Sequence, residues 1–202
     1  MISSSASPAR NLTLKEAAVL SGVTEKAIRH ELAASVVRST RARRRLCFGP
    51  REVFFFHLVR ELPFELRKED RKDLFELIAG RKSRRGHWRR EAHRLVLGGG
   101  VPVELPTDEL ARRVAARIRL FLRGRRRVVS RLEILGGEPV FEGTRVSVRD
   151  LGERVKKGEP TRDLLEDFPG LDADDLEFAR MFVELGKPPG RPRKLRFVRG
   201  DG

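Results

Sequence analysis

The 202-residue sequence is poor in the residue types that build catalytic, metal and stacking sites. It has no tyrosine, one tryptophan, one cysteine and four histidines. A single cysteine excludes an internal disulfide and is typical of a reducing compartment. Scarce aromatic side chains argue against an RNA-binding surface built on base stacking. Because the histidines are not clustered with other ligands at a recognised spacing, we expect no metal site and no cofactor.

Long apolar runs are absent as well. No stretch of about 18 apolar residues occurs, so we expect no membrane span. Residues 1–11 are rich in serine and lack the apolar core of a secretory signal, and we expect them to be disordered. These features together predict a cytoplasmic protein.

Charge is abundant and is arranged in blocks. Residues 1–60 carry 11 basic and 4 acidic side chains, a net +7, and residues 61–129 carry 19 and 10, a net +9. The sign reverses in residues 130–185, where 8 basic and 14 acidic side chains leave −6, and residues 186–202 return to +5. Basic blocks predict a polyanion or an acidic protein surface as partner. The acidic block needs a different role.

Residues 12–62 carry the pattern of a winged helix-turn-helix domain. Thr13 and Glu16 have the spacing of a capping box that begins a helix, and Gly22 suits the tight turn that ends it. Thr24 caps a second helix, whose early residues would enter the major groove of DNA. The candidate DNA-binding residues on this helix are Thr24, Lys26, Arg29 and His30.

A basic run, 38–45, follows this helix pair. We expect it to connect a strand at Val36–Val37 to a strand at Leu46–Phe48 and so to form the wing. Its candidate contacts to phosphates or to a minor groove are Arg41, Arg43, Arg44 and Arg45. A charge run is equally often a solvated loop, and that alternative stays open.

Residues 63–129 predict a middle region of helices and a β-hairpin. One helix is expected from Lys68 to Ala79, and a second from Pro106 to Leu122, ended by Gly124. Between them, a strand over 88–97 turns at the glycines 98–100 into a short strand at 101–103. Cys47 is expected in the core, and Trp88 in the core or at an interface.

Residues 130–185 predict a small three-helix domain. A strand over 129–134 is expected to pair with 144–146, and Ser147, Thr161 and Asp172 are positioned to cap the three helices. The third helix is acidic at its start, with Asp172, Asp174, Asp175 and Glu177. These carboxylates would repel phosphates in a DNA groove. We therefore expect this unit to dimerise or to pack on the basic middle region, and not to read DNA.

Two segments of this unit resemble a known domain. GGEPVFEGTRVSVRDL, followed by KKGEPTRDLLEDFPGLDADDLEFA, is similar to a small prokaryotic domain with the motifs GGxPxxxGTRxxV and DFPxL. The segments offer no nucleophile with a base and no phosphate-binding loop, so we expect them to have a structural role. The opening of the chain, LTLKEAAVLSGVTEKAIRHEL, is less specifically similar to MerR-like DNA readers. A winged helix-turn-helix followed by the small domain resembles the VapB-type antitoxins.

That resemblance implies a function. VapB-type antitoxins neutralise a PIN-domain ribonuclease toxin and repress their own operon. PIN nucleases hold metal ions through clustered carboxylates, so a basic arm with apolar anchors would fit over such a site. In the tail, 186–202, the candidate toxin-binding residues are Arg191, Arg193, Lys194, Arg196 and Arg199. The alternative for this segment is an ordinary solvated end.

Taken together, the sequence predicts an α+β fold that is mostly helical, and no catalysis. The expected order is a winged helix-turn-helix, a middle with a short β-hairpin, and a C-terminal three-helix, helix-turn-helix-like domain. The expected partners are double-stranded operator DNA, a PIN-domain toxin and a second copy in a homodimer. The main alternative is a transcription regulator that stands alone without a toxin. RNA binding and enzymatic activity are weaker alternatives.

Overall fold

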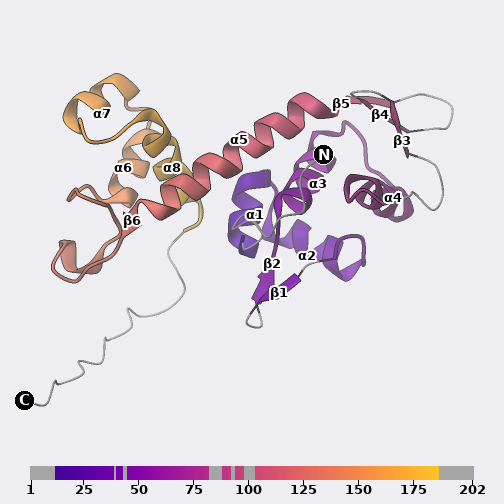
Figure 1. Ribbon diagram of the computed structural model, residues 1–202, viewed down its shortest axis with the longest axis horizontal. Helices are drawn as coiled ribbons and strands as arrows, with labels where there is room; N and C mark the ends of the chain where they lie inside the picture. Colours follow the sequence, from indigo (N-terminus) through magenta and orange to yellow (C-terminus); the bar gives the residue numbers. More distant parts are fainter. Residues whose placement is uncertain are drawn as a thin grey trace, which may run out of the picture.

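A computed structural model of the chain describes residues 12–38, 40–42, 45–81, 88–91, 94–97 and 103–186. Its central element is α5 (Thr107–Arg126), a helix of 20 residues that spans about 30 Å. The N-terminal helices and a small sheet lie along one end of α5, and the last three helices lie at its other end (Figure 1). The described part of the chain is mostly helical with small antiparallel strand pairs, an α+β fold.

The first two helices begin where their capping residues predict. α1 (Leu14–Ser21) starts at Thr13, whose hydroxyl accepts from the N–H of Glu16 while the Glu16 carboxylate accepts from the N–H of Thr13. Gly22 ends it in the left-handed conformation, with φ 73°. α2 (Glu25–Ala33) follows after three residues and is capped by Thr24. These sequence predictions are confirmed.

The expected strand at Val36–Val37 is wrong. Both N–H groups bond back to the carbonyl of Glu31, so the pair completes the end of α2 and buries its side chains in the core. The strands are β1 (Thr40–Ala42) and β2 (Arg45–Cys47), paired antiparallel with Ala42 opposite Arg45. They therefore occupy half of the basic run, with residues 43 and 44 between them.

Two further helices complete the N-terminal core. α3 (Pro50–Glu61) places proline at its first position, and α4 (Lys68–Ile78) is followed by Gly80 at φ 77°. Edge-to-face contacts join Phe55 to both Phe56 and Phe75. Such pairs contribute about 0.5–1.5 kcal/mol beyond the area they bury.

The expected single strand over 88–97 is two strands. β3 (Trp88–Glu91) pairs antiparallel with β4 (Arg94–Leu97), and β4 pairs with β5 (Val103–Pro106), which gives a three-stranded sheet in the order β3-β4-β5. An alternating pattern continues through a tight reversal, so the pattern alone conceals the turn. As expected, Trp88 is in the core, and its indole N–H donates to the carbonyl of Asp70 at 3.0 Å. Cys47 is buried, also as expected.

Gly124 lies inside α5 and does not end it, which corrects the expected boundary at Leu122. A Cβ at Gly124 would lie 2.1 Å from the ring of Phe178. The glycine is therefore a close-packing position between α5 and α8 (Ala173–Glu184). Also on α5, Arg125 pairs with Glu16 at 3.0 Å, and Arg117 donates to the carbonyl of Val19 at 3.3 Å. The same helix thus holds both the first and the last helices of the fold.

The C-terminal part begins with two short strands, β6 (Val128–Val129) and β7 (Val140–Phe141), which pair with each other. The expected strands over 129–134 and 144–146 are both wrong: β6 ends at Val129, and 144–146 belong to the turn region after β7. The 3-10 turn η2 (Leu135–Gly137) lies between the strands, and α6 (Val148–Lys156) and α7 (Thr161–Asp167) follow. Ser147 and Asp172 cap α6 and α8 as predicted, whereas Thr161 is the first residue of α7 and Pro160 holds its cap position.

α6 and α8 form the closest helix pair of the C-terminal part. Gly152 on α6 leaves no room for a side chain, because a Cβ there would lie 2.2 Å from the carbonyl oxygen of Ala179. Phe178 fills the space between α5 and β7, touching the rings of Phe121 and Phe141. None of the described helices has both the length and the apolarity needed to cross a bilayer.

Candidate nucleic-acid interface

The outer face of α2 is the candidate surface. In this helix only Ile28 is buried, while Lys26, Arg29 and His30 are all exposed on the outside. Thr24 is exposed too, but its hydroxyl is engaged by the N–H of Ala27 at 3.1 Å. The structure thus brings together the four residues of α2 that the sequence singled out. Thr24 acts first as a cap, and the other three present exposed side chains.

The charges on this face are not equivalent. Arg29 lies 3.6 Å from Glu25, one turn earlier, and both side chains are exposed. Lys26 forms no ion pair with any described residue. At its inner edge α2 is fixed by Glu31, which pairs with Arg71 of α4 at 3.1 Å, both side chains being mostly buried. A fixed inner edge and a free outer face are what a helix that enters a DNA groove requires.

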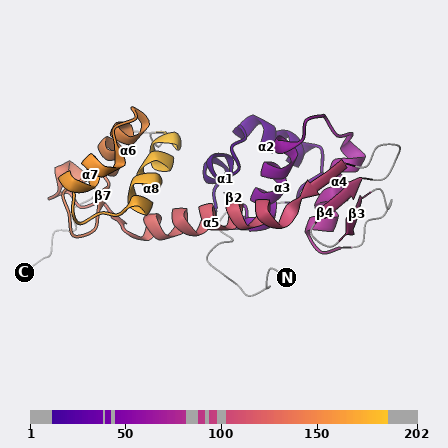
Figure 2. The same ribbon diagram turned by 90° about the horizontal axis from the view of Figure 1, so that it is seen from above.

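The wing candidates are only partly placed. The backbones of Arg41 and Arg45 lie on β1 and β2, with Arg41 opposite Leu46 in the register. Arg43 and Arg44 lie outside the described residues, as do the tail candidates Arg191, Arg193, Lys194, Arg196 and Arg199. Both views place α1 and α3 between α2 and α5, so α2 lies on the side of the N-terminal unit away from the long helix (Figures 1 and 2).

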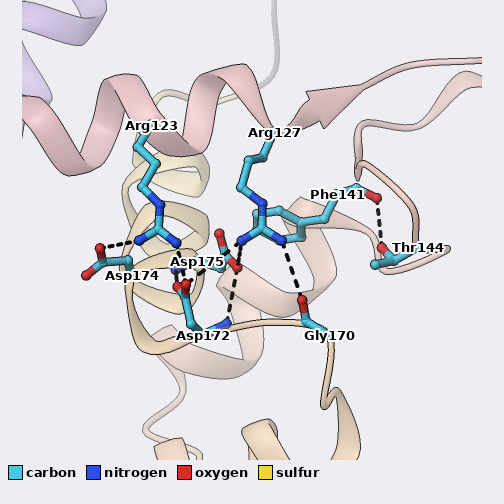
Figure 3. Close-up of polar contacts among 8 residues, drawn as sticks. All are labelled: Arg123, Arg127, Phe141, Thr144, Gly170, Asp172, Asp174 and Asp175. Atoms are coloured by element: carbon cyan, nitrogen blue, oxygen red, sulfur yellow. Dashed lines mark hydrogen bonds and ion pairs between the residues drawn. The ribbon is translucent and has the colours of Figure 1, made fainter.

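The carboxylates at the acidic start of α8 bind two arginines, Arg123 of α5 and Arg127 directly after it (Figure 3). Arg123 donates to Asp172 and to Asp174, and Arg127 donates to Asp175. Arg127 also reaches the carbonyl of Gly170 at 3.4 Å. Of the two alternatives predicted for this unit, packing on the basic middle region is therefore present in the monomer.

These contacts shift the acidity of the groups involved. Partial burial would raise the pKa of Asp172, but hydrogen bonds from Arg123 and from the N–H of Asp175 outweigh it and lower that pKa. The hydrogen bond from Arg180 lowers the pKa of Glu177, against the effect of its burial. Charged pairs hold both carboxylates ionised, which is the state a structural link needs.

The GTR motif builds a turn. Gly143 takes φ 78°, and the Thr144 hydroxyl donates to the carbonyl of Phe141 at 2.8 Å and accepts from the N–H of Val146 at 3.1 Å. Gly170 of the DFPGL segment lies beside Thr144, since a Cβ on this glycine would be 4.0 Å from the threonine methyl. The two motifs therefore meet in space and shape the same corner. Within the described ranges, no three His, Cys, Asp or Glu side chains are grouped to hold a metal ion.

Comparison with known proteins also treats the C-terminal part as a separate unit. The model of a family described as "Protein of unknown function (DUF433)" matches residues 128–183, the segment that carries both motifs. A relative from Sinorhizobium fredii (strain NBRC 101917 / NGR234), named "Uncharacterized protein y4eO", is 41% identical over 66 residues, which is 33% of this chain. The chain spans 30% of that relative's length. No solved structure matches the chain.

Sequence reasoning missed one group of charged residues on α5. Arg112, Arg119 and Arg126 are exposed and have no ion pair among the described residues. Their spacing of seven residues places them in one row along the helix. That seven-residue spacing is the signal in the sequence that could have identified them.

Proposed function

We propose that this chain is a DNA-binding antitoxin that represses its own operon and neutralises a PIN-domain ribonuclease. The observation that carries the DNA-binding part is the free outer face of α2, with Lys26, Arg29 and His30 exposed beside one another. Lysine and arginine bind guanine edges and phosphates, and the first turns of such a helix lie nearest the bases. Thr24 holds the start of α2 in place.

The arrangement around α2 supports a winged helix-turn-helix. α1 and α2 are joined by a turn containing Gly22, and the β1–β2 pair follows at once. In this proposal Arg41, Arg43, Arg44 and Arg45 contact the backbone beside the groove that α2 enters. Because arginine pairs with the acidic start of α8, we assign DNA recognition to the N-terminal unit.

A homodimer would present two copies of α2 to two half-sites about 34–36 Å apart. Two exposed leucines on the segment between β6 and β7 support self-association through the C-terminal unit, since Leu132 is 53% and Leu135 56% exposed. Deleting residues 130–185 should then abolish the dimer in light scattering. A stable dimer of that deletion variant would rule out this site of association.

For the toxin, the proposal rests on the antitoxin resemblance and on the composition of the tail. Arg191, Arg193, Lys194, Arg196 and Arg199 would pair with the carboxylates of the nuclease site and displace its metal. The alternative is a DNA-binding regulator without a toxin, which the α2 face alone would serve equally well. The two functions differ in what the adjacent reading frame encodes.

The first test measures DNA binding by fluorescence anisotropy on the promoter of the chain's own operon. We expect Lys26→Ala with Arg29→Ala to weaken binding at least about 30-fold, since each contact contributes about 1–3 kcal/mol. The matched control, Lys156→Ala with Lys157→Ala, removes the same charge from the C-terminal unit and should change affinity little. Equal losses in both pairs would contradict recognition by α2.

The second test purifies the protein of the adjacent reading frame and measures its ribonuclease activity with and without this chain. Complete inhibition that is lost when the chain ends at Gly186 is the expected result. Inhibition by the shortened chain would overturn the tail as the toxin-binding element. If no complex forms while promoter binding persists, the stand-alone regulator is correct.

A further inference from the structure

The outer face of α5 presents charged and apolar rows side by side. Arg112, Arg119 and Arg126 form the exposed row, with neighbours about 10 Å apart along the helix. Beside them, Ala111, Ala115 and Leu122 are only partly buried. Together with the buried Ile118, these apolar residues repeat at intervals of four, three and four, the spacing of a coiled-coil seam.

A groove runs along this helix. It has a volume of about 1100 Å³ and is lined by α5 residues that include Ala115, Arg119 and Leu122. Leu20, Pro50 and His57 of the N-terminal unit line it as well, as do Asp174 and Glu177 of α8. Both acidic residues have partners of their own, since Asp174 binds Arg123 and Glu177 binds Arg180. Arg119 and Arg126 therefore line the groove without an ion pair among the described residues, and Arg112 continues their row toward the start of α5.

Charge decides which occupant fits. A second copy of α5 packed antiparallel would place Arg119 against Arg119 and Arg112 against Arg126. A parallel copy would leave the arginines without an acidic partner, because the positions that face them are Val114 and Phe121, which are buried in the core of this chain. Like charges at these flanking positions oppose pairing. A nucleic-acid backbone would satisfy the arginines but leave the apolar row against a charged chain. An amphipathic helix with acidic flanks satisfies both rows.

We propose that the face of α5 formed by Ala111, Arg112, Ala115, Arg119, Leu122 and Arg126 is a docking site for an acidic amphipathic helix of a partner protein. This site goes beyond the proposed DNA interface and does not depend on it. α1 and α3 separate α2 from α5 (Figure 2), so the proposed DNA-binding helix and the proposed docking helix lie on different sides of the N-terminal unit and can be occupied at once.

The probe is a fluorescent helical peptide of about three heptads with leucine at the seam and glutamate at the flanking positions. Its binding to the full chain is measured by anisotropy, beside a peptide with lysine in place of glutamate. The acidic peptide should bind and the basic one should not. The triple variant Arg112→Glu, Arg119→Glu, Arg126→Glu should weaken binding at least about tenfold, because it turns three exposed attractions into repulsions.

Two controls separate this site from the general charge of the chain. The triple variant Lys68→Glu, Lys72→Glu, Lys156→Glu makes the same change in net charge elsewhere and should alter affinity less than about twofold. Leu122→Ser keeps the charge and removes an apolar contact, and it should weaken binding several-fold. Variants at Lys26 and Arg29 that lose DNA should keep full peptide affinity, so failure of one proposal does not imply failure of the other.

Three results would overturn the inference. The first is equal loss of affinity in the two triple variants, which would indicate a non-specific charge effect. The second is unchanged affinity of the Leu122→Ser variant, which would exclude the apolar row. The third is a homodimer that dissociates in light scattering when Leu122 is replaced by serine, because a second copy would then be the occupant. Melting temperatures of the charge variants should match that of the parent chain, since the replaced side chains are exposed. That of Leu122→Ser should fall slightly, because Leu122 packs in part against the core.

Discussion

Arg127, directly after α5, binds the carboxylate of Asp175, whose side chain is only 1% exposed. Asp175 is at the same time half of the capping box of α8, accepting from the N–H of Asp172 at 3.1 Å. One buried carboxylate therefore joins the start of α8 to the end of the long helix. The neighbouring Arg123 pairs instead with Asp172 and Asp174, whose side chains are 47% and 51% exposed.

This difference predicts unequal costs for two similar substitutions. Arg127→Ala leaves a buried carboxylate without its counter-charge, and we expect a loss of about 2 kcal/mol in the free energy of unfolding, below the range for a fully buried pair because Arg127 is itself 31% exposed. Arg123→Ala frees carboxylates that water already reaches, so its effect should be clearly smaller. Urea denaturation of both variants provides the measurement. Equal losses would show that burial of Asp175 does not control this link.

The lowered pKa values of Asp172 and Glu177 predict a dependence of stability on pH. Both groups bind protons more weakly in the folded chain than in the unfolded one, where the values are about 3.9 and 4.3. Their contribution is therefore complete at neutral pH and is lost as the pH falls below about 4. The melting temperature should decline over that range. Asp172→Asn keeps a capping side chain but removes the charge, and it should flatten the decline. An unchanged profile for this variant would contradict the role of Asp172.

Local signals predicted the local parts of this fold well. Thr13, Thr24, Ser147 and Asp172 all cap helices, because a capping side chain bonds to an N–H only two or three residues away. The information needed for such a bond lies entirely in neighbouring residues. Of the candidate site, the exposed face of α2 was predictable for the same reason.

Long-range packing determines the features that the sequence predicted wrongly. Glycine is typical of a helix end, but Gly124 is needed inside α5 because the ring of Phe178 packs against it. Phe178 lies more than fifty positions away in the sequence. Val36–Val37 has strong β-propensity, yet both N–H groups bond to the carbonyl of Glu31 and both side chains are buried in the core. The split of 88–97 into β3 and β4 likewise depends on pairing between strands. None of these partners is visible in a local window.

The packing of α6 on α8 predicts a sharp difference between two glycines of similar sequence context. Gly152→Ala would place a methyl group 2.2 Å from a backbone oxygen, which cannot move without shifting α8. We expect at least about 3 kcal/mol of destabilisation. Gly158→Ala meets nothing within 4 Å, and its φ of 84° costs only about 1 kcal/mol. Thermal melts followed by circular dichroism would rank the two, and a reversed order would contradict the close approach of α6 and α8.

The pairing of Glu25 with Arg29 predicts a gain of function. Glu25 begins α2 and would lie near phosphates if this helix enters a groove, where its charge opposes binding and its contact at 3.6 Å draws Arg29 aside. Glu25→Gln should therefore raise promoter affinity roughly threefold at low salt, in line with one exposed charge interaction, and the gain should shrink as salt screens it. The matched control, Glu133→Gln, removes the same charge from an exposed position on the C-terminal unit and should leave affinity unchanged. A gain of equal size in the control would mean that net charge alone governs binding. A loss of affinity for Glu25→Gln would mean that the carboxylate itself contacts a base, such as the amino group of cytosine, and that Arg29 needs Glu25 to hold its position.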